Sequence, residues 1–389
     1  MRITAVKTVV VNAEMRNWVF VKVETDQPGL VGWGEATLEW KTRGVAGCVA
    51  DFEPLLLGED PTRIEYLYQK MYRHSFFRMG AVGMSAISGI EQACWDIFGK
   101  EMGTPVYRLL GGAVRDRVRM YTHLGGGQME KVYETFDPGP LVELAQQVVE
   151  RGYSAVKVVF IPYSEPLMGL PAVRQVGGLM KALREGVGEK IDIMIDFHGR
   201  CYPATAIQYI EALAPYEPFF CEEPVPPENA AAMAEVKQAV KVPIAAGERL
   251  VTRFGFREIF ERQAVHVIQP DLCHCGGLLE ARKIAAAAET CYMGVAPHNP
   301  LGPIATAAAI HFDFATPNFL IQEDMLSDVP WRNEVVRSSL KHEKGYWLPP
   351  TEPGLGVEVD EERAARHPYQ PEVQHTVNAR GADGSIVDW

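Results

Sequence analysis

The stretch Ile191-Asp192-Ile193-Met194-Ile195-Asp196 is a short apolar run that closes on an acid. Further apolar runs along the chain close in the same way, and their last residues are Glu222, Glu248, Asp271, His298 and Glu323. Successive end residues are separated by 23 to 27 positions. An interval of that length accommodates one strand, one helix and two loops.

Regular alternation of short apolar strands with helices is the pattern of a parallel sheet. A buried parallel strand is a brief apolar run, and a crossover helix returns the chain to the same end of the sheet. Polar residues at successive strand ends would therefore share one rim. In an α/β barrel of the (β/α)8 TIM type, that rim is the C-terminal face, where catalytic residues converge. The sequence thus predicts a modified (β/α)8 barrel with a functional site at that face.

Length and composition indicate a globular protein with more than one structural unit. The chain has 389 residues, and a barrel of about 250 residues leaves room for a second unit. The net charge of −12 disfavours binding to nucleic acid or to an anionic membrane. No apolar run approaches the length of about 18 residues that a membrane span requires. The seven cysteines are scattered and mostly in apolar surroundings, which indicates reduced thiols and a cytoplasmic location.

Residues 1–118 predict a separate α+β capping domain, or lid. Three strand-like runs, with the turn Gln27-Pro28-Gly29 between the second and the third, indicate an antiparallel meander. Helical periodicity follows, and the third helical segment has Ser85 as its candidate N-cap. Strands followed by helices are typical of an α+β unit rather than of the first turns of a barrel.

Residues 119–347 show the alternation of strand-like and helix-like segments and form the predicted catalytic barrel. Within this range, residues 160–176 are rich in Pro and Gly and predict an irregular excursion. Residues 348–389 no longer show the alternation of strand and helix patterns. We expect this C-terminal segment to pack back on the capping domain and complete it, with a loosely held end over 376–389 as the alternative.

Three of the strand-end acids, Asp196, Glu222 and Glu248, come from consecutive predicted strands. Carboxylates without a cysteine or histidine partner select a hard cation, and a site with open positions for substrate and water suits Mg²⁺. Without a cation, three such groups in one pocket would repel one another, and their pKa values would rise. The alternative is that each acid pairs with an arginine or lysine on the rim, such as Arg200, Arg249 or Arg253. Pairing would still leave three acids aimed at one axis, so we predict a magnesium site.

Two histidines are candidates for acid–base chemistry beside this cluster. His298 and Asp271 lie on adjacent predicted strands, and a carboxylate that holds one imidazole nitrogen raises the basicity of the other. A structural role is the alternative for His298 taken alone. His198 follows Asp196 by two positions and would lie on the opposite side of the cation. Two imidazoles that flank one cation suit removal of a proton from one carbon and expulsion of a group from the next.

Five further residues are candidates for contact with a substrate. Two belong to the predicted lid loop 38–43 and three lie near the predicted rim; they are Glu39, Trp40, His123, Lys157 and Arg200. A loop of mixed charge with one aromatic residue is equally typical of a solvated surface, so both readings of the lid loop stay open at this point.

The motifs around these residues resemble those of the enolase superfamily, and within it the mandelate racemase subgroup, over nearly the whole chain. The resemblance is carried by Ser85-Ala86-Ile87-Ser88-Gly89-Ile90-Glu91-Gln92-Ala93-Cys94-Trp95-Asp96, Asp196-Phe197-His198-Gly199-Arg200, Cys221-Glu222-Glu223-Pro224, Ala246-Gly247-Glu248-Arg249, Gln269-Pro270-Asp271-Leu272 and Ala296-Pro297-His298-Asn299-Pro300-Leu301-Gly302-Pro303. The barrel motifs are most similar to those of sugar-acid dehydratases in the subgroup.

The resemblance implies a role for each strand-end residue. The ligands of Mg²⁺ would be Asp196, Glu222 and Glu248. His298, held by Asp271, would abstract the proton next to the substrate carboxylate.

The remaining roles concern the leaving group and the intermediate. By the same resemblance, His198 would protonate the departing hydroxyl group, and Glu323 would hydrogen-bond the enolate oxygen. The Lys-x-Lys motif that carries a base in racemases of the family is incomplete, because Lys157 is followed by Val158 and Val159. Racemisation needs bases on both faces of the substrate, so this departure favours dehydration.

The expected function is Mg²⁺-dependent dehydration of a sugar acid, a galactonate-like aldonate or a related acid, to its 2-keto-3-deoxy product. Trp40, His123 and residues 160–176 depart from the resemblance where the distal hydroxyl groups would bind, so the resemblance implies the reaction class and leaves the sugar open. The alternatives are a racemase, epimerase or cycloisomerase on the same scaffold, a sugar-acid-binding protein without turnover, and a Schiff-base aldolase based on Lys157. The resemblance also implies a homo-oligomer.

Overall fold

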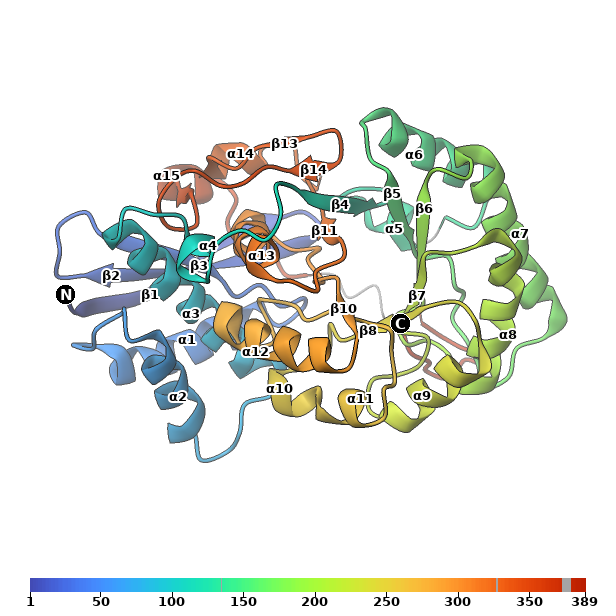
Figure 1. Cartoon of the computed structure of the whole chain (residues 1–389), viewed down its shortest axis with the longest axis horizontal. Coiled ribbons are helices and arrows are strands. Elements are labelled where there is room, and N and C mark those ends of the chain that lie inside the picture. The colour runs from blue at the N-terminus through green and yellow to red at the C-terminus, as the bar shows by residue number, and fades with distance from the viewer. Residues whose placement is uncertain (134, 327, 373–378) are drawn as a thin grey trace.

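The computed structural model describes residues 1–133, 135–326, 328–372 and 379–389. It begins with a three-stranded antiparallel sheet whose strands are β1 (Ile3–Ala13), β2 (Arg16–Thr25) and β3 (Val31–Glu35). The helices that follow are α1 (Thr42–Leu56), α2 (Ile64–His74), α3 (Ala81–Glu101) and α4 (Val106–Leu109). Figure 1 shows these elements in blue and cyan at one side of the molecule. The predicted antiparallel meander and the helices after it are confirmed.

Two glycines on β3 let α3 pack directly against the capping sheet. Gly32 and Gly34 face the backbone of Ala93 and Gly89, and a Cβ atom at either β3 position would collide with a carbonyl oxygen of the helix. The obstructing atoms belong to the backbone, so no change of side-chain rotamer would relieve the collision. The Gly-x-Gly pattern therefore sets the distance between helix and sheet, and with it the position of the loop after Glu35.

The described residues between 118 and 324 form eight parallel strands that close into a barrel. In order around the barrel they are β4 (Val118–His123), β5 (Ala155–Val158), β6 (Asp192–Asp196), β7 (Phe220–Glu222), β8 (Ile244–Ala246), β9 (Val267–Ile268), β10 (Gly294–Val295) and β11 (Gln322–Asp324). Neighbours from β4 to β10 pair in parallel, and β11 pairs with β4. A parallel bridge between Val295 and Phe319 closes the seam. The predicted TIM-type barrel is confirmed.

Helices return the chain between these strands and cover the outside of the barrel (Figure 1). They are α5 (Met129–Tyr133), α6 (Pro138–Glu150), α7 (Leu170–Val187), α8 (Pro203–Leu213), η1 (Ala214–Tyr216), α9 (Ala230–Ala239), α10 (Thr252–Gly255), α11 (Arg257–Glu261), α12 (Gly277–Thr290) and α13 (Pro303–Ala315). None of the helices in the described ranges is long and apolar enough to cross a membrane.

The barrel is modified after its last strand. The elements that follow β11 are α14 (Arg332–Val335), β12 (Val336–Ser338), β13 (His342–Glu343), β14 (Tyr346–Trp347), β15 (Val357–Val359) and α15 (Glu361–Ala364). Strand β14 pairs antiparallel with the start of β4, and α15 contacts β1 of the capping sheet. A hairpin and a path back to the capping elements thus follow β11, where a regular barrel would continue with a long helix.

Side chains from all eight strands or their flanks fill the interior of the barrel. They form a separate buried cluster, which consists of Tyr121, Ala155, Met194, Phe220, Ala245, Val267, Ala296 and Ile321. Large side chains from some strands lie against small ones from others, so the interior is a packed core rather than a pore. The polar residues at the strand ends therefore face a cavity at the rim.

A buried carboxylate joins the capping sheet to the barrel. Glu35, at the end of β3, accepts hydrogen bonds from the backbone N–H groups of Gly302 (2.8 Å), Ile304 (3.1 Å) and Ala305 (2.8 Å) at the start of α13. The hydroxyl of Thr37 donates a further bond to it at 2.7 Å. An acid at a helix N-terminus satisfies N–H groups that have no partner within the helix and complements the helix dipole. This contact holds the lid against the barrel.

We expect Glu35→Ala to lower the free energy of unfolding by about 3 to 5 kcal/mol, because it leaves buried N–H groups without their charged partner. Glu35→Gln keeps an acceptor oxygen and should lose less. Chemical denaturation followed by circular dichroism measures the difference. Glu343→Ala, at an exposed position on β13, is the matched control. Equal stabilities of the Glu35→Ala and Glu343→Ala proteins would contradict the assignment.

The C-terminal segment packs on the capping elements over residues 348–372. The backbone N–H of Leu355 donates to Asp96 Oδ1 on α3 at 2.8 Å. The side-chain amide of Asn17 on β2 donates to the carbonyl of Gln370 at 2.8 Å. Both bonds are made to the part of the chain that the sequence assigned to the lid.

The last described residues lie at the mouth of the barrel. Of residues 376–389, those from 376 to 378 fall outside the described part of the chain. In the rest, the N–H of Val387 donates to the carbonyl of Ala379 (3.3 Å), and the N–H of Ala382 donates to Glu165 Oε1 (3.0 Å) in the loop after β5. Trp389 lines the same cavity as Glu223 and Glu248, which follow β7 and β8, and Figure 1 marks the C-terminal end near those two strands.

Two local predictions were wrong. Ser85 is not an N-cap, because α3 begins at Ala81 and the Ser85 hydroxyl donates to the carbonyl of Ala81 (2.8 Å) from within the helix. Residues 160–176 are not one irregular excursion, because α7 begins at Leu170. Pro171 occupies the first turn of α7, where its missing N–H costs nothing.

Candidate active site

Three carboxylates meet at the C-terminal rim of the barrel. Asp196 ends β6, Glu222 ends β7, and Glu248 lies two residues after β8. The parallel register places Asp196 opposite Glu222. One oxygen from each of the three residues lies within 4.8 Å of the other two. The structure thus brings together the residues that the spacing predicted for a metal site.

The donor set of this cluster fits a hard divalent cation. All three groups are carboxylates, and Mg²⁺ prefers oxygen ligands. The Oε2 atom of Glu248 is buried and has no hydrogen-bond partner among the described residues. A buried polar atom without a partner is unfavourable, and a bound cation would supply that partner. Burial, and then repulsion from Asp196, raises the pKa of Glu222 to about 7. Burial also raises the pKa of Glu248 well above its ordinary value.

A buried lysine compensates part of this negative charge. Lys157, from β5, is fully buried, and its Nζ lies 2.9 Å from Glu222 Oε2, 2.8 Å from Glu323 Oε1 and 3.5 Å from Asp196 Oδ2. Burial alone would lower the pKa of Lys157, but the carboxylates of Glu222 and Glu323 raise it well above its ordinary value. Burial alone would raise the pKa of Asp196, whereas His198 and Lys157 lower it well below its ordinary value.

His298, three residues past β10, is held by Asp271, three residues past β9. Its Nδ1 lies 2.7 Å from Asp271 Oδ2, and its Nε2 lies 3.5 Å from Glu248 Oε2. When Nδ1–H donates to Asp271, Nε2 carries the lone pair on the side of the acid cluster. Burial alone would lower the pKa of His298, but Glu248, Glu323 and Asp271 raise it well above its ordinary value. The same carboxylates therefore increase the affinity of the imidazole for a proton.

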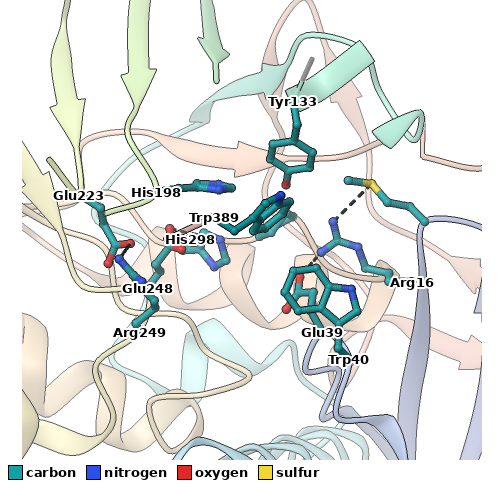
Figure 2. Close-up of a pocket in the computed structure, with 12 residues that line it drawn as sticks. Arg16, Glu39, Trp40, Tyr133, His198, Glu223, Glu248, Arg249, His298 and Trp389 are labelled. Carbon is teal, nitrogen blue, oxygen red and sulfur yellow. Dashed lines mark hydrogen bonds and ion pairs between the residues drawn. The ribbon is translucent and has the colours of Figure 1, made fainter. Parts of the chain in front are cut away.

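His198 enters the same cavity from the end of β6 (Figure 2). Its backbone is left-handed (φ 51°), which is uncommon for a residue other than glycine, and Gly199 continues the turn (φ 65°). The backbone N–H of His198 donates to Asp196 Oδ1 at 2.9 Å and fixes this turn. The Nε2 atom of His198 lies 3.4 Å from Asp196 Oδ2. Burial lowers the pKa of His198, and the Asp196 carboxylate opposes that effect.

The cavity between lid and barrel has a volume of about 340 Å³, which suits a small ligand. Its walls come from both units and consist of Met15, Arg16, Glu39, Trp40, Tyr133, His198, Glu223, Glu248, Arg249, His298, Pro300 and Trp389 (Figure 2). Glu39 and Trp40 thus lie where the lid hypothesis placed them. Glu39 forms an ion pair with Arg16, so a cation from β2 also reaches this wall.

Sequence reasoning missed several residues of this wall. Glu223 was not among the predicted site residues, yet it lines the cavity and pairs with Arg249 at 2.7 Å. Its positive φ of 40° turns the chain out of the strand, so strand alternation no longer sets the direction of the side chain. Tyr133 and Trp389 carried no signal of their own, because loop positions have no periodicity that predicts their direction.

Three predicted substrate contacts lie behind the described cavity wall instead of in it. Lys157 is engaged with the acid cluster. The guanidinium of Arg200 is buried and donates to the carbonyl of Ile161. The imidazole of His123 lies 2.5 Å from Glu323 Oε1. His123 Nδ1 and Arg200 Nε and Nη2 have no hydrogen-bond partner among the described residues, and contact of these three residues with substrate stays a prediction.

Glu323 is fully buried and held by three donors. Its partners are Lys157 Nζ, His123 Nε2 and the backbone N–H of Asn299, which lies 2.8 Å from Oε2. Burial alone would raise the pKa of Glu323, but Lys157 and His298 lower it well below its ordinary value. An ionised carboxylate accepts hydrogen bonds and cannot donate one. Donation to an enolate oxygen would require Glu323 to take up a proton first.

The lid and the barrel match two parts of one enzyme family. Residues 2–111 match the mandelate racemase / muconate lactonizing enzyme N-terminal domain, and residues 140–363 match the enolase C-terminal domain-like family. The chain therefore belongs to the mandelate racemase / muconate lactonizing enzyme family of the enolase superfamily. The family predicted from the motifs is confirmed.

Individual relatives cover nearly the whole chain. A D-galactonate dehydratase from Variovorax paradoxus (strain S110) is 39% identical over 378 residues, 96% of each chain. One from Ralstonia pickettii (strain 12J) is 40% identical over 380 residues, again 96% of each chain. The crystal structure of a mandelate racemase/muconate lactonizing enzyme-like protein from Roseovarius sp. TM1035 is similar with a TM-score of 0.89 at 35% identity, over 96% of this chain and 97% of that one.

Proposed function

We propose that the protein dehydrates a galactonate-like sugar acid in a Mg²⁺-dependent reaction and forms a 2-keto-3-deoxy acid. It is an enzyme of the hydro-lyase class, the class of its D-galactonate dehydratase relatives. One observation carries the proposed mechanism. His198 and His298 line the same cavity, and each lies beside a different member of the carboxylate cluster, at 3.4 Å from Asp196 and 3.5 Å from Glu248.

The carboxylate cluster would hold the cation. Its ligands would be Asp196, Glu222 and Glu248. When bound, Mg²⁺ supplies positive charge that opposes the negative charge developing on the substrate carboxylate. Lys157 lies behind the cluster and keeps the carboxylates in place by ion pairs.

His298 is the proposed base. Its Nε2 takes the proton from the carbon next to the substrate carboxylate, and the electrons of that C–H bond form the enolate. Asp271 accepts the Nδ1–H bond at 2.7 Å, so it orients the ring and stabilises the imidazolium that forms. Glu39 and Trp40 bring the lid into the wall of the cavity, where a lid over the substrate would limit the access of water to this step.

His198 is the proposed acid. It donates a proton to the hydroxyl oxygen on the neighbouring carbon as the C–O bond breaks, so that the hydroxyl leaves as water. The enol that remains tautomerises to the 2-keto-3-deoxy acid. Proton removal and hydroxyl departure thus use separate imidazoles, one from β10 and one from β6.

We expect His198→Asn to lower product formation by about 10²- to 10⁴-fold, the usual contribution of a general acid. Exchange of the α proton in D₂O should continue, because His298 and Asp271 are intact. Proton NMR measures exchange and product in one sample. His74→Asn, at an exposed position on α2, is the control. Loss of exchange to the same extent as product would remove His198 from the role of a dedicated acid.

A panel of aldonates and other sugar acids, incubated with and without Mg²⁺, tests the reaction itself. Formation of a 2-keto-3-deoxy acid from a galactonate-like substrate is expected. Exchange of the α proton without any keto product would instead favour a racemase or epimerase.

The geometry argues against the Schiff-base alternative. A lysine that forms an imine must be neutral, which requires a lowered pKa. Lys157 has a raised pKa and ion pairs with Glu222 and Glu323. Borohydride treatment in the presence of substrate should therefore trap no adduct.

A further inference from the structure

Trp389 lies at the centre of a cluster of rings inside the cavity (Figure 2). Its ring centroid is 4.7 Å from that of Tyr133, 5.0 Å from that of His198 and 5.0 Å from that of Trp40. Tyr133 also contacts His198, with 5.2 Å between the centroids. Separations of this size are those of favourable aromatic packing. Two aromatic side chains, those of Tyr133 and Trp389, therefore pack against the imidazole of His198.

Besides His198, the rings of the cluster come from three distant parts of the chain. Trp40 belongs to the loop after β3 in the lid, and Tyr133 ends α5 in the barrel. Trp389 follows a short turn that is tied to the barrel by the bond from Ala382 N–H to Glu165 Oε1 at 3.0 Å. Trp389 thus joins a lid residue to the barrel residue that we assign as the acid.

The ring of His198 has few other constraints. Among the described residues, its polar side-chain contact is with Asp196, at 3.4 Å. A single polar contact of that length does not by itself fix the orientation of the ring. The packing of Trp389 and Tyr133 against the ring restricts it further.

We propose that Trp389 is the positioning residue of His198, and that it keeps the acid aimed at the leaving hydroxyl group. This inference rests on the proposed dehydration. Trp389 itself transfers no proton in the reaction. Its removal disorders the acid and leaves the base, His298 with Asp271, in place. The enolate then forms but returns to substrate more often than it loses water.

The distinguishing quantity is the ratio of α-proton exchange to product formation in D₂O. Trp389→Ala is expected to lower product formation by about 10- to 100-fold, since a small misplacement of a catalytic group can cost about 10²-fold. Exchange should fall much less, so the ratio should rise at least tenfold and approach that of His198→Asn. Trp389→Phe keeps a ring in place and should restore most of the wild-type ratio.

Two controls separate this effect from a general disturbance. Ile386→Ala alters the same segment at an exposed side chain and should keep the wild-type ratio. Thermal melts and Mg²⁺ titration show whether the Trp389→Ala protein is folded and holds its cation. Proportional losses of exchange and product in Trp389→Ala would overturn the inference, and so would unchanged product formation. A wild-type enzyme that exchanges the α proton of every sugar acid tested but forms no keto product would overturn the proposed dehydration, and the inference with it.

Discussion

Replacing His298 with Asn is expected to lower turnover by about 10²- to 10⁴-fold, because the variant has no base to take the α proton. The imidazole is held at 2.7 Å by Asp271, and nearby carboxylates raise its pKa well above the ordinary value. An Asn side chain keeps a polar group of similar size but is not basic. Exchange of the α proton in D₂O should be lost together with product. This loss of both signals is the opposite of the pattern expected for His198→Asn.

The control for this prediction is a histidine away from the cavity. His342→Asn, at an exposed position on β13, should keep wild-type turnover. Calorimetry should show that the His298→Asn protein still binds Mg²⁺, because its carboxylate cluster is unchanged. Turnover of the His298→Asn enzyme above a tenth of the wild-type value would mean that another group is the base.

Much of the fold could be predicted because the barrel repeats. Apolar runs that close on an acidic or histidine residue, like the one that ends at Asp196, recur at near-constant intervals. A single short apolar run is weak evidence for a strand, but its repetition at a constant spacing is strong evidence for a barrel. Local features occur once, so no second copy supports their interpretation. Ser85 looked like an N-cap because serine favours that position, but the helix extends one turn further towards the N-terminus. Pro171 looked like a loop residue because its place in the first turn of α7 cannot be told from composition.

The strand-end residues of the site were accessible to sequence reasoning for a physical reason. Parallel strands direct their C-terminal ends to one rim, so position along the repeat fixes location in space. Residues contributed by loops have no such rule. Glu223 turns into the cavity through a positive φ, and Trp389 arrives from a segment remote in the sequence. Arg200, near the rim in sequence, instead turns towards the carbonyl of Ile161.

Removal of divalent cations is expected to abolish turnover and to destabilise the fold. The cluster places three carboxylates within 4.8 Å of one another, and Glu248 Oε2 has no hydrogen-bond partner in the described structure. A cation that binds the folded chain alone stabilises it by about 2.7 kcal/mol when its concentration is 100 times Kd. Dialysis against EDTA, followed by melting curves and assays during Mg²⁺ titration, measures both effects. Turnover should return with the same Mg²⁺ dependence as stability.

Glu222→Gln tests whether this stabilisation comes from the cluster. The variant removes one charge from the centre of the group while it keeps the shape of the side chain, so Mg²⁺ should no longer raise the melting temperature as it does in the wild type. Glu211→Gln makes the same chemical change at an exposed position on α8 and should keep the full response. An undiminished response in Glu222→Gln would place the cation elsewhere.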